Sequence, residues 1–170
     1  ANNSNVRIDA FTGKLTYKES NNKNFEYADI GGHWAEEAIT NLSQIQLGLK
    51  GENFYPDNKI TQEDLFRLFY SGMRSNYYLD ADTDNLYERL ISTKIITEEE
   101  KAPEAQVTRE NAFVYMIRLA ELERVAKLAD IYKVNFADSD KLSEGKLGYA
   151  AILSGMGVVC GDGGTLRPTD

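Results

Sequence analysis

The apolar positions of this chain follow two different periods. Residues 5–10 and 14–17 alternate polar and apolar side chains on either side of a turn signal at Thr12-Gly13, which is typical of a β-hairpin. From residue 35 onward the apolar residues recur at three- and four-residue spacing, which is typical of helices with one buried face. We therefore expect a mainly α-helical chain with a small N-terminal β-hairpin.

Five helices are expected from this pattern. The first carries a stripe at Ala35, Ala38, Ile39, Leu42 and Ile45, and the second, capped by Thr61, carries one at Leu65, Leu68, Phe69, Gly72 and Met73. A short helix is expected around Leu86 and Leu90, a long one from the cap Thr108 toward Leu128, and a last one over residues 143–154.

Three segments of the helical part read as imperfect copies of one unit. The first, residues 27–78, opens with Tyr27-Ala28-Asp29 and continues with Gly-His-Trp-Ala at 32–35. The second, residues 79–130, is more divergent, and its clearest part is the Thr-Arg-Glu start at 108–110. The third, residues 131–170, has Phe-Ala-Asp at 136–138 and a Gly-rich loop at 161–168, and we expect it to be incomplete because its second capped helix is missing. Residues 1–26 are expected to be a hairpin and linker, which either packs on the helical part or is the end of a preceding domain. Such repeats bury their apolar faces against each other and present grooves between copies, so binding is the first expectation.

Composition narrows the function classes. A net charge of −8 argues against nucleic acid or an anionic membrane as partner, and no run of about 18 apolar residues predicts a membrane span. Cys160 and His33 are the only residues of their types. This excludes an intrachain disulfide and a cysteine-based or His-rich metal site, and it removes most His-based triads from consideration. We expect a protein that is not an enzyme and carries no cofactor and no metal.

These motifs in this order resemble the S-layer homology (SLH) module of bacterial surface proteins. The resemblance covers residues 27–170. It implies three helix–loop–helix modules packed as a pseudo-threefold bundle, an extracellular location in the cell wall or S-layer, and non-covalent anchoring of a secreted protein. The implied partner is an acidic, pyruvylated secondary cell-wall polysaccharide bound in the grooves between modules.

The resemblance also names candidate ligand residues. A helix N-terminus and a guanidinium both suit the carboxylate of such a sugar, and an aromatic ring suits its apolar face. In the first copy Gln62 stands where the arginine belongs, so that groove lacks its cation. The candidates are Thr108, Arg109, Glu110, Trp34, Gly161, Asp162, Gly163, Thr165 and Arg167.

Alternatives exist at each level. Arg109 could instead pair with Glu110 or Glu104, and Trp34 could be a packing anchor. The whole region could be a structural spacer or self-association region that has lost glycan binding, or the targeting tail of a surface hydrolase. The incomplete third copy is expected to leave an apolar face that another molecule or the hairpin covers, so self-association through it is a further expectation.

Overall fold

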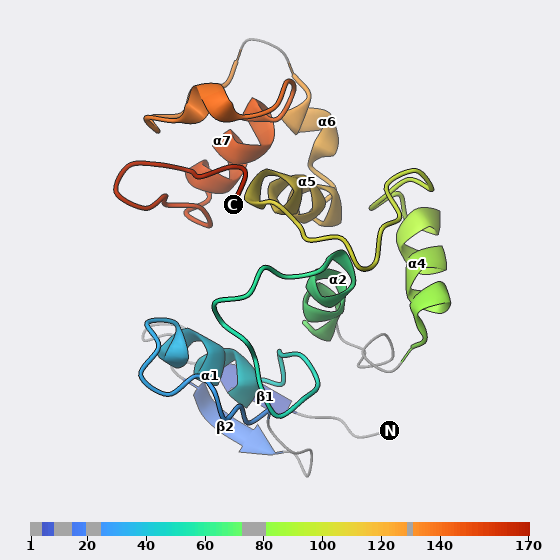
Figure 1. Ribbon diagram of the computed structural model, residues 1–170, viewed down its shortest axis with the longest axis vertical. Coiled ribbons are helices and arrows are strands. Elements are labelled where there is room, and N and C mark those ends of the chain that lie inside the picture. The colour runs from blue at the N-terminus through green and yellow to red at the C-terminus, as the bar shows by residue number, and fades with distance from the viewer. Residues whose placement is uncertain (1–4, 9–14, 20–24, 73–80, 129–130) are drawn as a thin grey trace. The chain divides into compact units, whose positions relative to one another are not determined.

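The computed structural model describes residues 5–8, 15–19, 25–72, 81–128 and 131–170, and these are mainly helical (Figure 1). This confirms the expected class at the level of secondary structure. The elements are β1 (Asn5–Ile8), β2 (Leu15–Glu19), α1 (Glu36–Gln44), α2 (Gln62–Ser71), α4 (Thr83–Ser92), α5 (Arg109–Leu119), α6 (Glu123–Ala126), the 3₁₀ helix η1 (Ser139–Lys141) and α7 (Leu147–Gly155). None of the described helices is both long and apolar enough to cross a bilayer.

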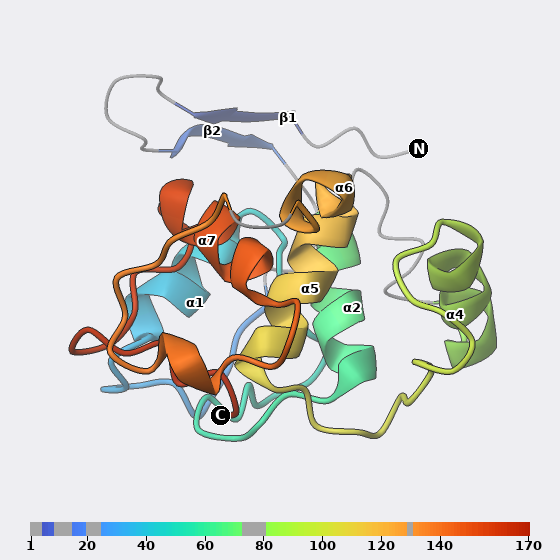
Figure 2. The same cartoon turned by 90° about the horizontal axis from the view of Figure 1, so that it is seen from above.

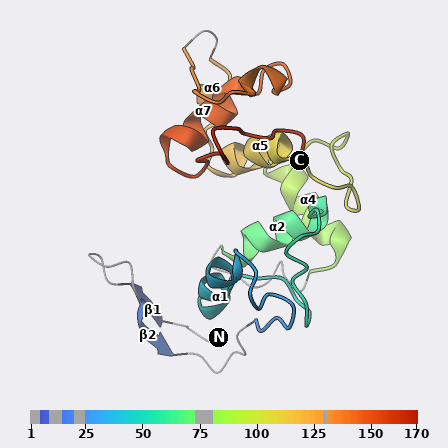
Figure 3. The ribbon, with the colours of Figure 1, turned by 60° about the vertical axis from the view of Figure 1, so that its left-hand side comes forward.

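Strands β1 and β2 lie antiparallel, with Asn5 opposite Glu19 and Arg7 opposite Tyr17 (Figure 3). The turn expected at Thr12-Gly13 is outside the described residues, so the complete hairpin stays a prediction.

The chain divides into two compact units. Unit 1 comprises residues 1–58 and 66–80, and unit 2 comprises residues 59–65 and 81–170. In unit 1, Ile39 of the expected stripe is buried, whereas Leu42 is 41% exposed. Among the residues of this unit whose burial is described, the other buried apolar side chains are Ile30, Phe66 and Tyr70.

The core of unit 2 forms between α5, α6 and α7, which lie against one another (Figure 2). Phe113, Val114 and Ile117 of α5 supply one side of this core. The other side is supplied by Ala126, Tyr149, Ala150, Leu153, Val159 and Leu166. Leu86 and Leu90 of α4 are completely buried, as expected from the sequence pattern. Tyr87 of the same helix is also completely buried, which the pattern did not predict.

Two expected helices have different boundaries. The helix that starts after Thr108 ends at Leu119 instead of continuing toward Leu128, because Leu122 N–H donates to Ile117 O and Glu121 takes a left-handed φ of 58°. These bonds close α5 and start the short α6 in a new direction. The last helix begins at Leu147 and not at residue 143, because Ser143 N–H donates to the Glu110 carboxylate and Gly145 has a φ of 78°.

The first and third copies share one loop structure. Asp29 accepts hydrogen bonds from Phe54 N and Tyr55 N, both at 2.7 Å. Asp138 does the same with Leu166 N at 2.7 Å and Arg167 N at 2.8 Å. Tyr55 and Arg167, which precede a proline in each copy, have φ values of 55° and 52°. The aromatic-x-Asp motif thus has a structural role in both copies, while the pseudo-threefold packing of three copies stays a prediction.

Candidate functional site

The start of α5 carries three of the candidate ligand residues. Thr108 is its N-cap and accepts a hydrogen bond from Asn111 N at 3.4 Å. Arg109 N–H donates to Asp170 O and Glu110 N–H donates to Pro168 O, both at 2.9 Å. The tip of the helix is therefore covered by residues 166–170, and these backbone donors are already in use. An anion bound here has to be held by the Arg109 side chain.

The Arg109 side chain is exposed to solvent beside the segment 166–170. Its Nε donates to Leu166 O at 2.9 Å, which fixes the guanidinium beside the end of the Gly-rich loop. Across the described residues, neither Glu110 nor Glu104 forms an ion pair with it, and Glu110 pairs with Lys146 instead. The terminal nitrogens of a guanidinium held only at Nε keep the planar fork that binds a carboxylate bidentately.

Glu110 has a different environment from its neighbour. It is 6% exposed and accepts hydrogen bonds from Ser143 N, Ser143 Oγ and Lys146 Nζ at 2.9, 2.6 and 2.8 Å. Burial opposes ionisation, but the bonds from Lys146 and Ser143 outweigh it and hold the pKa of Glu110 below its ordinary value. Glu110 therefore docks the segment before α7 onto α5.

The Gly-rich loop is a tight turn. Asp162 and Thr165 exchange two backbone hydrogen bonds of 2.9 Å, and Gly163 and Gly164 between them have φ values of 55° and 83°. Left-handed values at both central positions are those of a type I′ turn, which strongly favours glycine. Gly161, with a φ of 73°, lies so close to Phe136 that a Cβ would come within 2.6 Å of its ring. These glycines are explained by backbone conformation and packing.

Arg167 follows this loop, and its positive charge is paired with two carboxylates. Its guanidinium contacts the carboxylates of Asp162 and Asp170. The Asp170 hydrogen bond is the main reason that the pKa of Arg167 lies above its ordinary value. Of the two candidate arginines, Arg109 and Arg167, only Arg109 has no ion pair with a described residue.

Trp34 belongs to unit 1, just before α1. It is 89% exposed, and its ring lies 5.3 Å from the His33 ring, centroid to centroid. The exposure argues against the packing-anchor alternative and leaves the ring open to solvent.

The start of α2 has the same backbone hydrogen bonds as the start of α5, but its first side chain, that of Gln62, has a different environment. Gln62 N–H donates to Ala105 O and Glu63 N–H to Pro103 O, the same pattern as at Arg109 and Glu110. The Gln62 side chain is buried, however. Its amide bonds to Glu100 O, Tyr115 Oη, Tyr87 Oη and Ala102 N at 2.8–2.9 Å. The start of α2 therefore presents no cationic side chain in place of Arg109, and the side-chain amide of Gln62 is fully used in hydrogen bonds within the chain.

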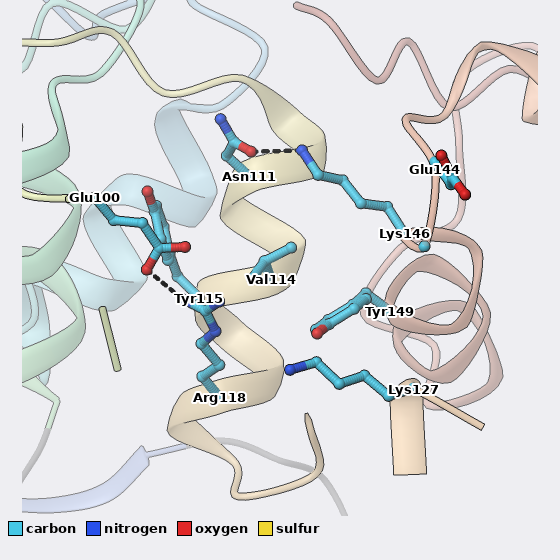
Figure 4. Close-up of a pocket in the computed structure, with 10 residues that line it drawn as sticks. Glu100, Asn111, Val114, Tyr115, Arg118, Lys127, Glu144, Lys146 and Tyr149 are labelled. Atoms are coloured by element: carbon cyan, nitrogen blue, oxygen red, sulfur yellow. Dashed lines mark hydrogen bonds and ion pairs between the residues drawn. The ribbon is translucent and has the colours of Figure 1, made fainter. Parts of the chain in front are cut away.

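A cavity of about 380 Å³ lies in unit 2 along α5, beside the start of α7 (Figure 4). Arg118 lines this cavity and donates to Glu100 at 2.6 Å and to Glu123 at 2.9 Å. The Tyr149 hydroxyl donates to Glu123 at 3.1 Å, and burial together with this carboxylate raises the pKa of Tyr149 to about 12. The tyrosine thus stays neutral at physiological pH. The cavity is lined by Glu100, Asn111, Val114, Tyr115, Arg118, Lys127, Glu144, Gly145, Lys146 and Tyr149.

Sequence reasoning did not find this cavity. Its residues on α5 are spaced as one helix face, but nothing in the local pattern shows that Lys127 and Glu144 lie against that face. No group of three His, Cys, Asp or Glu side chains in the described ranges is arranged to hold a metal ion. No protein-family model matches the chain, and a search of curated proteins gives no match.

Proposed function

We propose that this chain anchors a secreted protein to a bacterial cell wall by binding an acidic, pyruvylated polysaccharide non-covalently. Binding takes place outside the cell, without catalysis, and centres on Arg109 at the start of α5. The three predicted copies are proposed to act as SLH-like modules, with the ligand held where one copy meets the next.

The observation that carries the proposal is the environment of Arg109. Its backbone and Nε are tied to residues 166–170, and no described carboxylate neutralises it. A cation held in this way at a contact between two copies suits the carboxylate of an acidic sugar. The open face of Trp34 is a second surface suited to sugars, described within unit 1.

The test is binding to purified cell-wall sacculi before and after removal of their acidic polymer. The wild-type chain is expected to co-sediment only with untreated sacculi. Arg109→Ala should lower the affinity roughly tenfold to a hundredfold, as expected for a charge-assisted contact. Arg124→Ala is the matched control, because Arg124 is an exposed arginine on α6, and it should bind like the wild type.

One observation favours a second candidate, a structural spacer. The first N–H groups of α5 donate within the chain, and Glu110 is buried, so much of the predicted site stabilises the fold. Equal sedimentation with treated and untreated sacculi would support the spacer and contradict the anchor. Binding that Arg109→Ala leaves unchanged would keep the anchor and remove Arg109 from its site.

A further inference from the structure

Three side chains with complementary chemistry meet where the first turn of α5 faces the start of α7. Lys146 Nζ lies 2.7 Å from Asn111 Oδ1 and 2.8 Å from Glu110 Oε1. Figure 4 shows the Lys146 side chain reaching across to Asn111 on α5. An amine, a carboxamide and a carboxylate in mutual contact supply a nucleophile, an acyl group and a proton carrier. These are the groups from which a lysine–asparagine isopeptide bond forms.

The carbonyl carbon of Asn111 is within reach of the amine. With a C=O bond of about 1.23 Å and a hydrogen-bond angle of about 120° at the oxygen, a nitrogen 2.7 Å from Oδ1 lies roughly 3.5 Å from Cγ. Reacting atoms in a near-attack arrangement are about 3–3.5 Å apart. Two groups held in this way react as if one of them were present at about 10⁵–10⁸ M, which offsets the low reactivity of an amide.

Glu110 is placed to carry the protons of this reaction. It is 6% exposed, and Ser143 N and Ser143 Oγ each donate to one of its oxygens. Because its hydrogen bonds favour the ionised form, the resting pair is a carboxylate and an ammonium. The neutral amine forms when one proton crosses the 2.8 Å contact to Glu110. A positioned acid–base group of this kind contributes about 10²–10⁴-fold to a rate.

The amide nitrogen of Asn111 is the leaving group. The contacts of the described residues include no hydrogen bond to Asn111 Nδ2, and Asn111 lines the cavity of about 380 Å³ beside the start of α7. Ammonia released at this position therefore has an adjoining space into which it can leave.

We propose that Lys146 and Asn111 join spontaneously through an isopeptide bond. One proton passes from Lys146 Nζ to Glu110, and the neutral amine attacks Asn111 Cγ. Glu110 returns its proton to Nδ2, and the Cγ–Nδ2 bond breaks. The second proton that Nζ loses on forming the new amide leaves with this nitrogen, as ammonium. Glu110 ends as a carboxylate, so the reaction needs no oxidant and no other protein.

The new bond would close a covalent link between residues 35 positions apart, from the first turn of α5 to the start of α7. It would also replace the charge of Lys146 with a neutral amide. The proposal does not depend on polysaccharide anchoring.

The experiment is an intact-mass measurement on the whole purified chain. We expect a mass lower than that calculated from the sequence by about 17 Da, the mass of ammonia. Trypsin should then release a branched peptide in which residues 110–118 are joined to residues 142–170, because a modified Lys146 is not cleaved. Fragmentation of this peptide should place the bond between Asn111 and Lys146.

Variants test the assigned roles. Lys146→Arg keeps a positive charge but has no amine of this kind, and Glu110→Gln removes the proton carrier, so both proteins should have the full mass calculated from their sequences. Lys141→Arg, which changes an exposed lysine at the end of η1, should still show the loss of ammonia.

Several results would overturn the proposal. The wild-type chain could have its full calculated mass, or a mass about 18 Da lower, which a bond to the Glu110 carboxyl would give by loss of water. A loss of ammonia that persists in Lys146→Arg would place the reaction elsewhere in the chain. The branched peptide is measured on the wild type alone, so it decides the question even where a variant does not fold.

Discussion

At the scale of single residues, several motif positions have roles in holding the backbone. Asp138 satisfies two successive N–H groups, and the bond from Leu166 N–H is the main reason that its pKa lies below the ordinary value. Asp29 does the same in the first copy. Because a buried N–H without a partner is costly, a short acidic side chain at this place stabilises a loop that carries a left-handed residue.

Among the motif residues, Gln62 is the one for which we expect a large effect on stability. Gln62→Ala removes four hydrogen bonds and leaves the hydroxyls of Tyr87 and Tyr115 without this partner. We expect a loss of about 2 to 4 kcal/mol in the free energy of unfolding, measured by urea denaturation. Gln44→Ala, at an exposed position at the end of α1, should change it by less than about 0.5 kcal/mol. Similar losses for both variants would contradict the role of the buried amide.

At the scale of elements, close packing of α6 and α7 depends on one glycine. A Cβ at Gly148 would lie 2.0 Å from Ala126 O and 2.8 Å from the Tyr132 ring. The Tyr132 hydroxyl also donates to Val125 O. Gly148 is therefore enclosed by the backbone of α6 and by the ring of Tyr132. A side chain at this position requires the two helices to separate.

Gly148→Ala is therefore expected to destabilise the protein by about 1 to 3 kcal/mol, the usual cost of overpacking. The matched variant is Gly155→Ala at the end of the same helix, where a Cβ would meet nothing within 4 Å. That variant should be neutral or stabilising by up to about 1 kcal/mol. Thermal unfolding of both proteins checks the pair, and equal melting temperatures would refute the packing argument.

The helices show how far local pattern predicts this fold. Periodicity predicts α1 and α4, and the caps Thr61 and Thr108 mark the starts of α2 and α5, because these signals lie within a few residues of each other. Met73, expected in the second helix, lies outside the described residues. The end of α5 was missed because Glu121 takes its left-handed φ without a glycine or proline to mark it. The start of α7 was missed because Ser143 bonds to Glu110, which is 33 residues away.

In the candidate site, too, the local motifs can be predicted from the sequence and the contacts between distant segments cannot. The helix start at Thr108–Glu110 and the turn at Gly161–Thr165 are local motifs, and the contact of Arg109 with Leu166 brings their segments together. The cavity between α5 and α7 is made by side chains that meet only after folding, so no spacing along the chain predicts it. The sequence also cannot show that Glu110 faces Lys146 while Arg109 stays exposed.

At the scale of the whole molecule, acid should weaken the fold. Burial opposes ionisation of Glu110 and Glu123, yet their bonds to lysine and arginine partners hold both pKa values below the ordinary one. A carboxyl with a lowered pKa stabilises the folded state above its unfolded pKa, near 4.3, and this stability is lost as pH falls through the folded value. We expect the urea midpoint to change little from pH 7 to about pH 5 and to fall steeply below about pH 4.

The double variant Glu110→Gln, Glu123→Gln separates these two groups from the other carboxylates. It should be less stable at neutral pH and should lose less stability on acidification than the wild type. Parallel curves for the two proteins would show that the acid sensitivity comes from other groups.

The N-termini of α2 and α5 are hydrogen-bonded to later segments of the chain through main-chain atoms. Pro103 and Ala105 accept from the start of α2, and Pro168 and Asp170 accept from the start of α5. Amide and carbonyl groups are supplied by nearly every residue type, so mutation can alter side chains here and leave the ties intact. Substitutions at residues 103–105 and 168–170 are therefore expected to leave the starts of α2 and α5 attached, because the carbonyl groups that accept their N–H groups remain.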